Sequence, residues 1–383
     1  MRINSKTILA GMALGALLLT GCNDAEYDTL SNQAYILQTN TNANSSLKLT
    51  VGAEVATTTL NVRLSDVANV ESRYRLVYDT AVVNEYNRLN ETPYASLPQE
   101  SFSLSSEETT IEAGASVSTP ITLTVPPYSE ALKASGKKYA IGFRLENTSG
   151  NASVLPSGSK IVYILDQVVI QPVVVLDQSH YVSQNLVKNY PLTEWTVEMN
   201  INKHVLYTEV GRGNNQAIFG AGPDEIYIRF GDAPIEGNRL QIKTQGTQMN
   251  SLALFNEHTW YHLAFVCTGT KLYLYVNGQL DNSMDLPGKT TNVNSINICS
   301  PSTYWLGNAM YSEVRFWQRA RSQAEIANNM YACDPTTPGL ITYYKMNEGE
   351  GYSFRDASGN GNNAETNGQA VPEWIQDVRI DGK

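Results

Sequence analysis

The clearest pattern of apolar and polar positions in this chain is a pair of adjacent segments in its C-terminal half. Residues 260–267 are apolar at both parities apart from His262, as in a central strand covered on both faces. In residues 271–276 apolar and polar side chains alternate, as in a strand with one buried face. Gly269 and Asn277-Gly278 predict the turns, because these residues tolerate positive φ. The pattern predicts at least three antiparallel strands.

Further strands are predicted around this hairpin, and the connector at residues 166–175 is expected to begin the same domain as a strand. Four segments precede the hairpin and two follow it: residues 194–201, 216–221, 225–230, 239–244, 295–299 and 310–317. A helix is predicted from Ser322, because Ser322-Gln-Ala-Glu325 fits a capping box and Ile326 and Met330 then share a face. We assign residues 167–383 to this second domain.

The first half of the chain carries short alternating segments at a spacing of roughly ten residues, which is typical of a small antiparallel sandwich. These segments, separated by Gly, Pro, Asn and Ser, are residues 47–51, 59–64, 73–78, 121–125, 139–145 and 161–165. The only helical pattern in this half is at residues 129–135. We assign residues 30–166 to an immunoglobulin-like β-sandwich domain.

Three blocks of the second domain resemble the laminin-G-like, concanavalin-A-type family. W-Y-H-L-A-F-V followed by K-L-Y-L-Y-V-N-G-Q is similar to its central signature, and residues 312–326 and 340–361 are similar to two later blocks. The resemblance implies an all-β jelly-roll sandwich with one short helix. It indicates the fold far better than the ligand, because this fold hosts many functions.

Four phrases of the first domain resemble a domain of unknown function at the N terminus of bacterial surface lipoproteins. They are residues 82–87, 94–98, 110–114 and 136–139. That domain commonly precedes a laminin-G-like module or a glycosidase. The chain departs from the family at Ile141-Gly142, where a proline often follows the tyrosine, and a generic immunoglobulin-like spacer is the alternative.

The N terminus reads as a secretory signal, with a basic start and an apolar run in residues 1–21. Small residues before Cys22 resemble the bacterial lipobox, which implies lipid attachment at Cys22 and stable anchoring by several acyl chains. An ordinary signal peptide is the alternative. Residues 22–29 form an acidic tether, similar to the tag of lipoproteins on the outer face of the outer membrane. The expected location is therefore the outer membrane, facing the cell exterior.

Composition agrees with an exported, folded protein, since 42% of residues are hydrophobic and only 17% are charged. Without residues 1–21 the chain keeps 25 basic residues against 37 acidic ones. This balance excludes nucleic acid and anionic lipid as partners but is compatible with neutral sugars. Cys267 is expected to be buried and free. One disulfide among Cys267, Cys299 and Cys333 is the alternative.

Catalytic motifs are scarce in this sequence. Glycosidases need two carboxylates facing one cleft, and laminarinases and lichenases on this fold use alternating Glu, Asp and Glu, a pattern that is missing here. Glu194 and Glu198 share a strand parity, so they are the pair to consider, with exposed charges on an outer sheet as the alternative. His262 is expected to be a partly buried, hydrogen-bonded histidine rather than a catalyst.

A sugar-binding site requires an exposed aromatic ring that stacks on the sugar, flanked by amides and carboxylates that bind its hydroxyl groups. The loops of the second domain supply such groups, and the candidates are Tyr181, Tyr207, Asn214, Asn215, Tyr304 and Trp305. Trp305 precedes Gly307, where related domains begin a strand, so a core position is the alternative for its ring. Tyr304 has the opposite parity and is the better candidate for an exposed platform.

The loop at residues 356–362 concentrates oxygen ligands around glycines, which suits calcium. Asp356, Asn360 and Asn362 are the candidate ligands, and laminin-G-like relatives often carry a calcium near the binding rim. A structural turn in which Asp356 caps its own backbone is the alternative.

These observations predict a non-catalytic surface lipoprotein that binds glycan. Its resemblance implies that it captures oligo- or polysaccharide for an outer-membrane transporter, together with partner surface lipoproteins. Two alternatives come from other classes: an endo-acting glycosidase with an unrecognised carboxylate pair, and an adhesin that recognises host protein.

Overall fold

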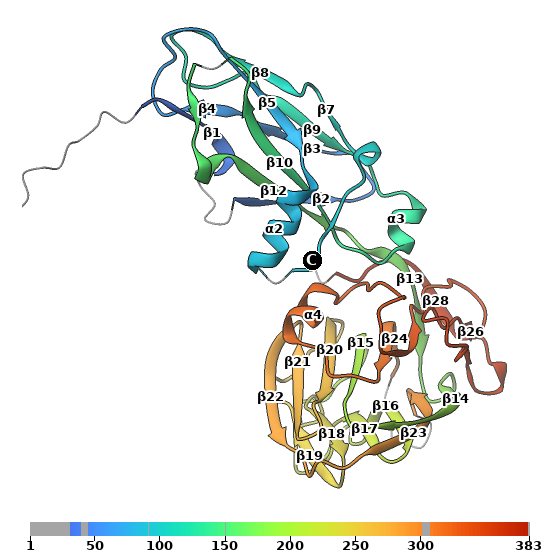
Figure 1. Ribbon diagram of the computed structural model, residues 1–383. Coiled ribbons are helices and arrows are strands. Elements are labelled where there is room, and N and C mark those ends of the chain that lie inside the picture. Colours follow the sequence, from blue (N-terminus) through green and yellow to red (C-terminus); the bar gives the residue numbers. More distant parts are fainter. Residues whose placement is uncertain (1–30, 40–44, 91, 150, 301–306, 382–383) are drawn as a thin grey trace, which may run out of the picture.

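The computed structural model describes residues 31–39, 45–90, 92–149, 151–300 and 307–381. Figure 1 shows two β-rich bodies that meet near helix α3 (Glu130–Ala134) and strand β13 (Ile170–Leu176). Each body has its own hydrophobic core. None of the helices in the described part of the chain is long and apolar enough to cross a membrane.

The N-terminal body is built from three antiparallel or mixed sheets. Their orders are β2-β12-β10-β5-β8 with β6 beside β10, β3-β9-β7, and β11-β1-β4. Strand β9 shows why these segments form strands, because Ile121, Leu123 and Val125 are buried while the threonines between them are half-buried. The strands are β1 (Gln33–Ile36), β2 (Ser46–Val51), β3 (Ala56–Leu60), β4 (Val62–Leu64), β5 (Ser72–Tyr78), β6 (Ala95–Ser96), β7 (Ser103–Leu104), β8 (Glu108–Ile111), β9 (Ile121–Val125), β10 (Tyr139–Asn147), β11 (Ser153–Val154) and β12 (Lys160–Gln167).

Two expectations for this body are wrong. The predicted strand at residues 59–64 is two strands, because the backbone of Asn61 bonds to Gln38 and Leu37 instead of continuing one ladder. Helix α2 (Thr80–Asn90) was not predicted, since its valines and asparagines are weak helix formers. It forms because Val82 and Val83 are buried against β10 and β12. The helix expected near residue 130 is confirmed as α3, capped by Ser129.

The C-terminal body is a sandwich of two antiparallel sheets, as the sequence predicts. One has the order β22-β21-β20-β15-β24-β13-β28 with β25 beside β24, and the other has the order β14-β23-β16-β17-β18-β19. A small hairpin, β26-β27, completes it. The bounds are β14 (Val182–Leu192), β15 (Trp195–Lys203), β16 (Gln216–Pro223), β17 (Ile226–Phe230), β18 (Leu240–Thr244), β19 (Thr247–Asn250), β20 (Trp260–Cys267), β21 (Lys271–Val276), β22 (Gln279–Asp285), β23 (Thr291–Ile298), β24 (Ala309–Trp317), β25 (Leu340–Tyr344), β26 (Ser353–Phe354), β27 (Ala364–Glu365) and β28 (Glu373–Arg379).

The hairpin β20-β21 and the start of helix α4 (Gln323–Asn328) confirm the sequence prediction, but the helix ends at Asn328, so Met330 does not lie on it. Between β21 and β22, Asn277 and Gly278 have φ of 51° and 76°, the left-handed conformations that the tight turn requires. The capping box of Ser322 and Glu325 is present in full. Gly278 lies against Ala327, so this turn and the helix pack together on the outer face of the β20-β21 pair. Cys267, Cys299 and Cys333 are all free and buried.

The two bodies touch directly. A Cβ on Gly136, just after α3, would lie 2.0 Å from the carbonyl oxygen of Cys333 in the C-terminal body. The ammonium of Lys137 lies 4.0 Å from the carboxylate of Asp334. Strand β13 follows β12 after only two residues, so the connector has little slack.

Candidate functional site

Only one member of the carboxylate pair considered for catalysis is exposed. Glu194 is exposed, whereas Glu198 on β15 is completely buried, and the expectation of an exposed pair is wrong for Glu198. Arg321 Nη1 donates to Glu198 Oε1 at 2.6 Å, and Arg315 Nη1 donates to Oε2 at 3.3 Å. This side chain lies on the outer face of the sheet, and the segment containing Arg321 and α4 covers that face.

Electrostatics fix the protonation states in this cluster. Burial alone would raise the pKa of Glu198, but Arg321, His262 and Arg315 together hold that pKa well below its usual range. Burial lowers the pKa of His262, whose Nε2 lies 3.3 Å from Glu198 Oε2. His262 is completely buried rather than partly buried as expected. The cluster therefore has no access to a substrate and acts as a structural ion network.

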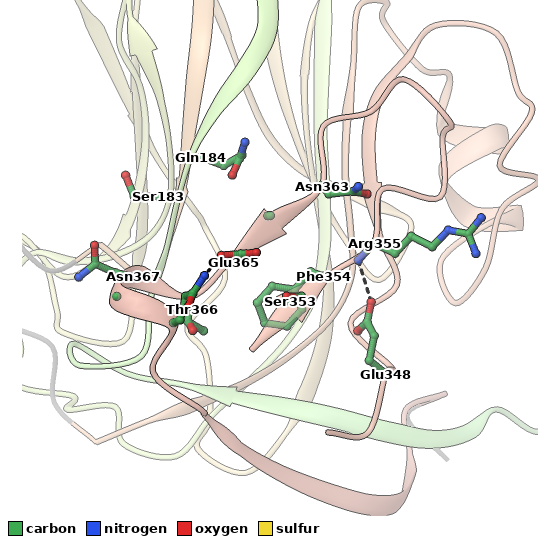
Figure 2. A pocket seen from close by; sticks show the side chains of 13 residues that line it. Ser183, Gln184, Glu348, Ser353, Phe354, Arg355, Asn363, Glu365, Thr366 and Asn367 are labelled. Carbon is green, nitrogen blue, oxygen red and sulfur yellow. Dashed lines mark hydrogen bonds between the residues drawn. The ribbon is translucent and has the colours of Figure 1, made fainter. Parts of the chain in front are cut away.

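A polar hollow of about 780 Å³ lies at the edge of the sandwich, beside β14 and the β26-β27 hairpin. Figure 2 shows its lining side chains, with Ser183 and Gln184 on one side and Glu348 and Arg355 on the other. The lining residues are Ser183, Gln184, Glu348, Ser353, Phe354, Arg355, Asn363, Ala364, Glu365, Thr366, Asn367, Gly368 and Gln369.

The hollow presents mostly hydrogen-bonding groups. Asn367 and Glu365 are exposed, and Gln369 Nε2 donates to Glu365 Oε2 at 3.1 Å. Glu348 is exposed, and it accepts from the backbone N–H of Arg355 at 3.0 Å. Phe354 is fully buried, so its ring belongs to the floor and not to a stacking platform. Amides, hydroxyls and carboxylates in one concavity suit a ligand with many hydroxyl groups.

The predicted calcium ligands lie next to this hollow but hold a turn. Asp356 Oδ1 accepts from the backbone N–H groups of Tyr343 and Ser358, and Oδ2 accepts from that of Asn362. Asn362 Oδ1 accepts from Val187, and Asn360 Nδ2 donates to the carbonyl of Leu340. The side-chain oxygens of Asp356 and Asn362 are thus engaged by N–H donors of the turn, and calcium binding at this loop stays a prediction.

Metal binding finds no other support in the described ranges. No three His, Cys, Asp or Glu side chains gather there in a way that could hold a metal ion. The turn instead positions the hollow, because Asn363 Oδ1 accepts from the backbone N–H of Asp356 at 2.9 Å and Asn363 lines the hollow.

Three of the predicted sugar-binding residues lie together in the loop before β16, and two of them, Tyr207 and Asn215, are engaged with protein. The guanidinium of Arg212 covers the ring of Tyr207, 4.0 Å from the ring centroid. Asn215 Oδ1 accepts from Tyr227 Oη at 2.9 Å and from Arg229 Nη1 at 2.8 Å. Asn214 is half-buried in the same loop, and its side-chain oxygen has no hydrogen-bond partner among the described residues. The structure therefore shows an internal polar network here.

The remaining candidates fall elsewhere. Tyr181 packs against the core as a half-buried residue, and its carbonyl accepts from the backbone N–H of Asn367, which places it beside the hollow. Tyr304 and Trp305 lie outside the described residues, as does Cys22. Sequence reasoning did not find the hollow itself. The polar run Asn363-Ala-Glu-Thr-Asn-Gly-Gln369, directly after the recognised turn, was the available signal.

Comparisons with known proteins agree with this architecture. Residues 30–152 match the model of a family of N-terminal domains, and residues 177–327 match the laminin G model of the concanavalin A-like lectin/glucanases superfamily. No curated protein matches the chain.

Among solved structures, a proposed carbohydrate binding protein from Bacteroides ovatus has 22% identity and a TM-score of 0.62, covering 91% of this chain and 100% of its own. EndoBT-3987 from Bacteroides thetaiotamicron with Man5GlcNAc product has 20% identity, a TM-score of 0.30 and coverage of 35% and 30%. The SAP-like pentraxin of Limulus polyphemus has 12% identity, a TM-score of 0.31 and coverage of 41% and 80%. At these identities the first structure supports the fold alone. The C-terminal body is therefore a laminin G-type domain of the concanavalin A-like lectin/glucanase superfamily, and it follows a separate N-terminal domain.

Proposed function

We propose that this chain is a surface lipoprotein that captures oligo- or polysaccharide in the polar hollow of its C-terminal domain and does not cleave it. The hollow carries the proposal, because it combines a ligand-sized volume of about 780 Å³ with converging amide, hydroxyl and carboxylate groups. The similar fold of a proposed carbohydrate binding protein supports it further. The buried ion network around Glu198 argues against catalysis by the pair that sequence reasoning considered.

Replacing Gln184 and Asn367 together by alanine should weaken glycan binding by roughly ten- to a hundredfold, because each amide contributes about 1 kcal/mol of hydrogen bonding. A broad glycan array with wild-type protein first identifies the glycans, and titration calorimetry then compares the dissociation constants. Asn256→Ala is the control, since Asn256 is exposed and does not line the hollow. Equal affinities in the double variant and the wild type would place the site elsewhere.

A glycosidase is the second candidate function, because two carboxylates, Glu348 and Glu365, line the same hollow. Local desolvation raises the pKa of Glu348, the direction that a general acid requires, although this residue is exposed. Long incubation of any bound glycan followed by chromatography separates the two functions. Binding without release supports capture. Oligosaccharide release that is lost in Glu348→Gln and in Glu365→Gln would instead make the chain an enzyme.

Cys22→Ala should release a folded protein from the membrane, because the proposed anchor depends on acylation of Cys22 and on no apolar helix of the described residues. Fractionation of cells carrying either protein is the measurement. We expect wild type in the outer-membrane pellet, beside a transporter that takes up the captured glycan. A variant that stays in the pellet after salt and carbonate washes contradicts the lipid anchor.

A further inference from the structure

The polar hollow beside β14 contains two carboxylates that no described cation neutralises. Glu348 and Glu365 both line the hollow, and both are exposed. Glu365 accepts from Gln369 Nε2, a neutral amide, and Glu348 accepts from the backbone N–H of Arg355. Neither carboxylate forms an ion pair with a described residue. A ligand that enters the hollow therefore meets two unpaired carboxylates.

The cationic side chain of the hollow does not offset this charge. Arg355 is the one lysine or arginine among the described residues that line it, and Arg355 is exposed. Figure 2 shows its guanidinium extending away from Glu365. The whole chain adds to the imbalance, because its formal net charge is −10 at pH 7. The local and the overall field both oppose the approach of an anion.

Acceptor atoms dominate the hydrogen-bonding groups that the two carboxylates and Gln184 leave open in the hollow. Glu365 Oε1 has no hydrogen-bond partner in the described part of the chain, and an ionised carboxylate can only accept. Gln184 Nε2 donates to the carbonyl of Asn185 at 2.7 Å, so Gln184 Oε1 is the atom left for a ligand. These acceptors require O–H donors, which the free hydroxyl groups of a sugar supply.

We propose that the hollow selects neutral glycans with free hydroxyl groups and excludes glycans that carry uronates, with Glu365 and Glu348 as the residues that determine this specificity. The inference rests on the capture function proposed above and names its substrate class. A uronate replaces a hydroxymethyl group by an anion that cannot donate, so it loses a hydrogen bond and meets a like charge. Such a repulsive element is a common source of specificity.

Three pairs of hexasaccharides test this selectivity on the full chain. The neutral members are β-1,4-linked glucose, β-1,4-linked mannose and α-1,4-linked galactose, and the acidic members are the uronates with the same linkages. Titration calorimetry should show binding of a neutral member and weaker binding of its uronate, by at least about tenfold.

Salt provides an independent measurement of the repulsion. Raising the ionic strength from about 0.01 M to about 0.15 M shortens the Debye length from about 30 Å to about 8 Å. The affinity for the uronate should therefore rise with salt, whereas the affinity for the neutral member should stay constant.

Glu365→Gln keeps the size of the side chain and removes its charge. It should weaken binding of the neutral hexasaccharide by about two- to tenfold, because a charged acceptor is lost. It should also narrow the difference between the neutral member and its uronate, and Glu348→Gln should act in the same direction. A purely structural role of either residue predicts equal changes for both members of a pair, so the ratio of the two dissociation constants separates the roles.

Glu225→Gln is the matched control, because Glu225 is an exposed carboxylate that does not line the hollow. Its ratio of dissociation constants should equal that of wild type. A uronate that binds wild type as tightly as its neutral counterpart overturns the selectivity and leaves glycan capture standing, as does a wild-type ratio in both Glu365→Gln and Glu348→Gln. Binding of none of the six hexasaccharides contradicts the capture function itself.

Discussion

Replacing Glu198 by glutamine should lower the free energy of unfolding by about 3–5 kcal/mol, the usual cost of breaking a buried ion pair from one side. The variant keeps the volume of the side chain but leaves Arg315 and Arg321 without their shared counter-charge. Both arginines are almost completely buried, at 0% and 4% exposure, so water cannot replace the lost carboxylate. Urea denaturation measures the effect as a lower midpoint at an unchanged slope.

Glu194→Gln is the matched control, because Glu194 directly precedes the same strand and is exposed. It should change stability by less than about 0.5 kcal/mol. The pKa of folded Glu198 lies below that of an unfolded glutamate, near 4.3, so its contribution is present above about pH 4.3 and is lost as the pH falls through the folded value. The difference between wild type and Glu198→Gln should therefore shrink in acid. A difference below about 1 kcal/mol at pH 7 would refute the structural role of the network.

Local patterns predicted the parts of the fold that local forces decide. The β20-β21-β22 strands follow from alternation and from the turn residues Gly269 and Asn277-Gly278, and helix α4 follows from its capping box, because all of these interactions join residues close in sequence. Helix α2 escaped prediction for the converse reason. Its residues favour other conformations, and packing of Val82 and Val83 on a sheet assembled from distant strands stabilises it.

The burial of Glu198 could not be read from its strand, because its partners Arg315 and Arg321 stand 117 and 123 residues further along the chain. Alternation on β15 correctly predicts that Glu198 faces away from the core between the sheets. It does not reveal that the segment around α4 covers that face and makes every residue of β15 buried.

The sequence predicted a turn next to the candidate site but not the site itself. The turn at residues 356–362 was recognised, but a group of oxygen ligands and a self-capped turn share the same composition, and only the hydrogen bonds of Asp356 separate them. The hollow joins that neighbourhood to Ser183 and Gln184 on β14, which are distant in sequence. Tyr207 was predicted to be a sugar-stacking ring, but the guanidinium of Arg212 covers it. An arginine close to a tyrosine in the sequence is as typical of a sugar site as of such an internal contact.

Gly136→Ala should separate the two domains. The new Cβ would lie 2.0 Å from the carbonyl oxygen and 2.5 Å from the carbonyl carbon of Cys333, closer than any real contact. These are backbone atoms next to the ion network, and they cannot rotate away as a side chain could. The clash is therefore relieved most readily by moving α3 off the C-terminal domain, which also breaks the contact of Lys137 with Asp334.

Gly114→Ala separates this clash from backbone strain. Gly114 also has a left-handed φ, 83° against 64° for Gly136, but its Cβ would meet nothing within 4 Å. Both variants should lose about 1–2 kcal/mol of stability from the conformation alone. Only Gly136→Ala should increase the radius of gyration in small-angle X-ray scattering and speed proteolysis of the connector near residues 168–169. An unchanged radius of gyration in Gly136→Ala would mean that the domains are not docked through α3.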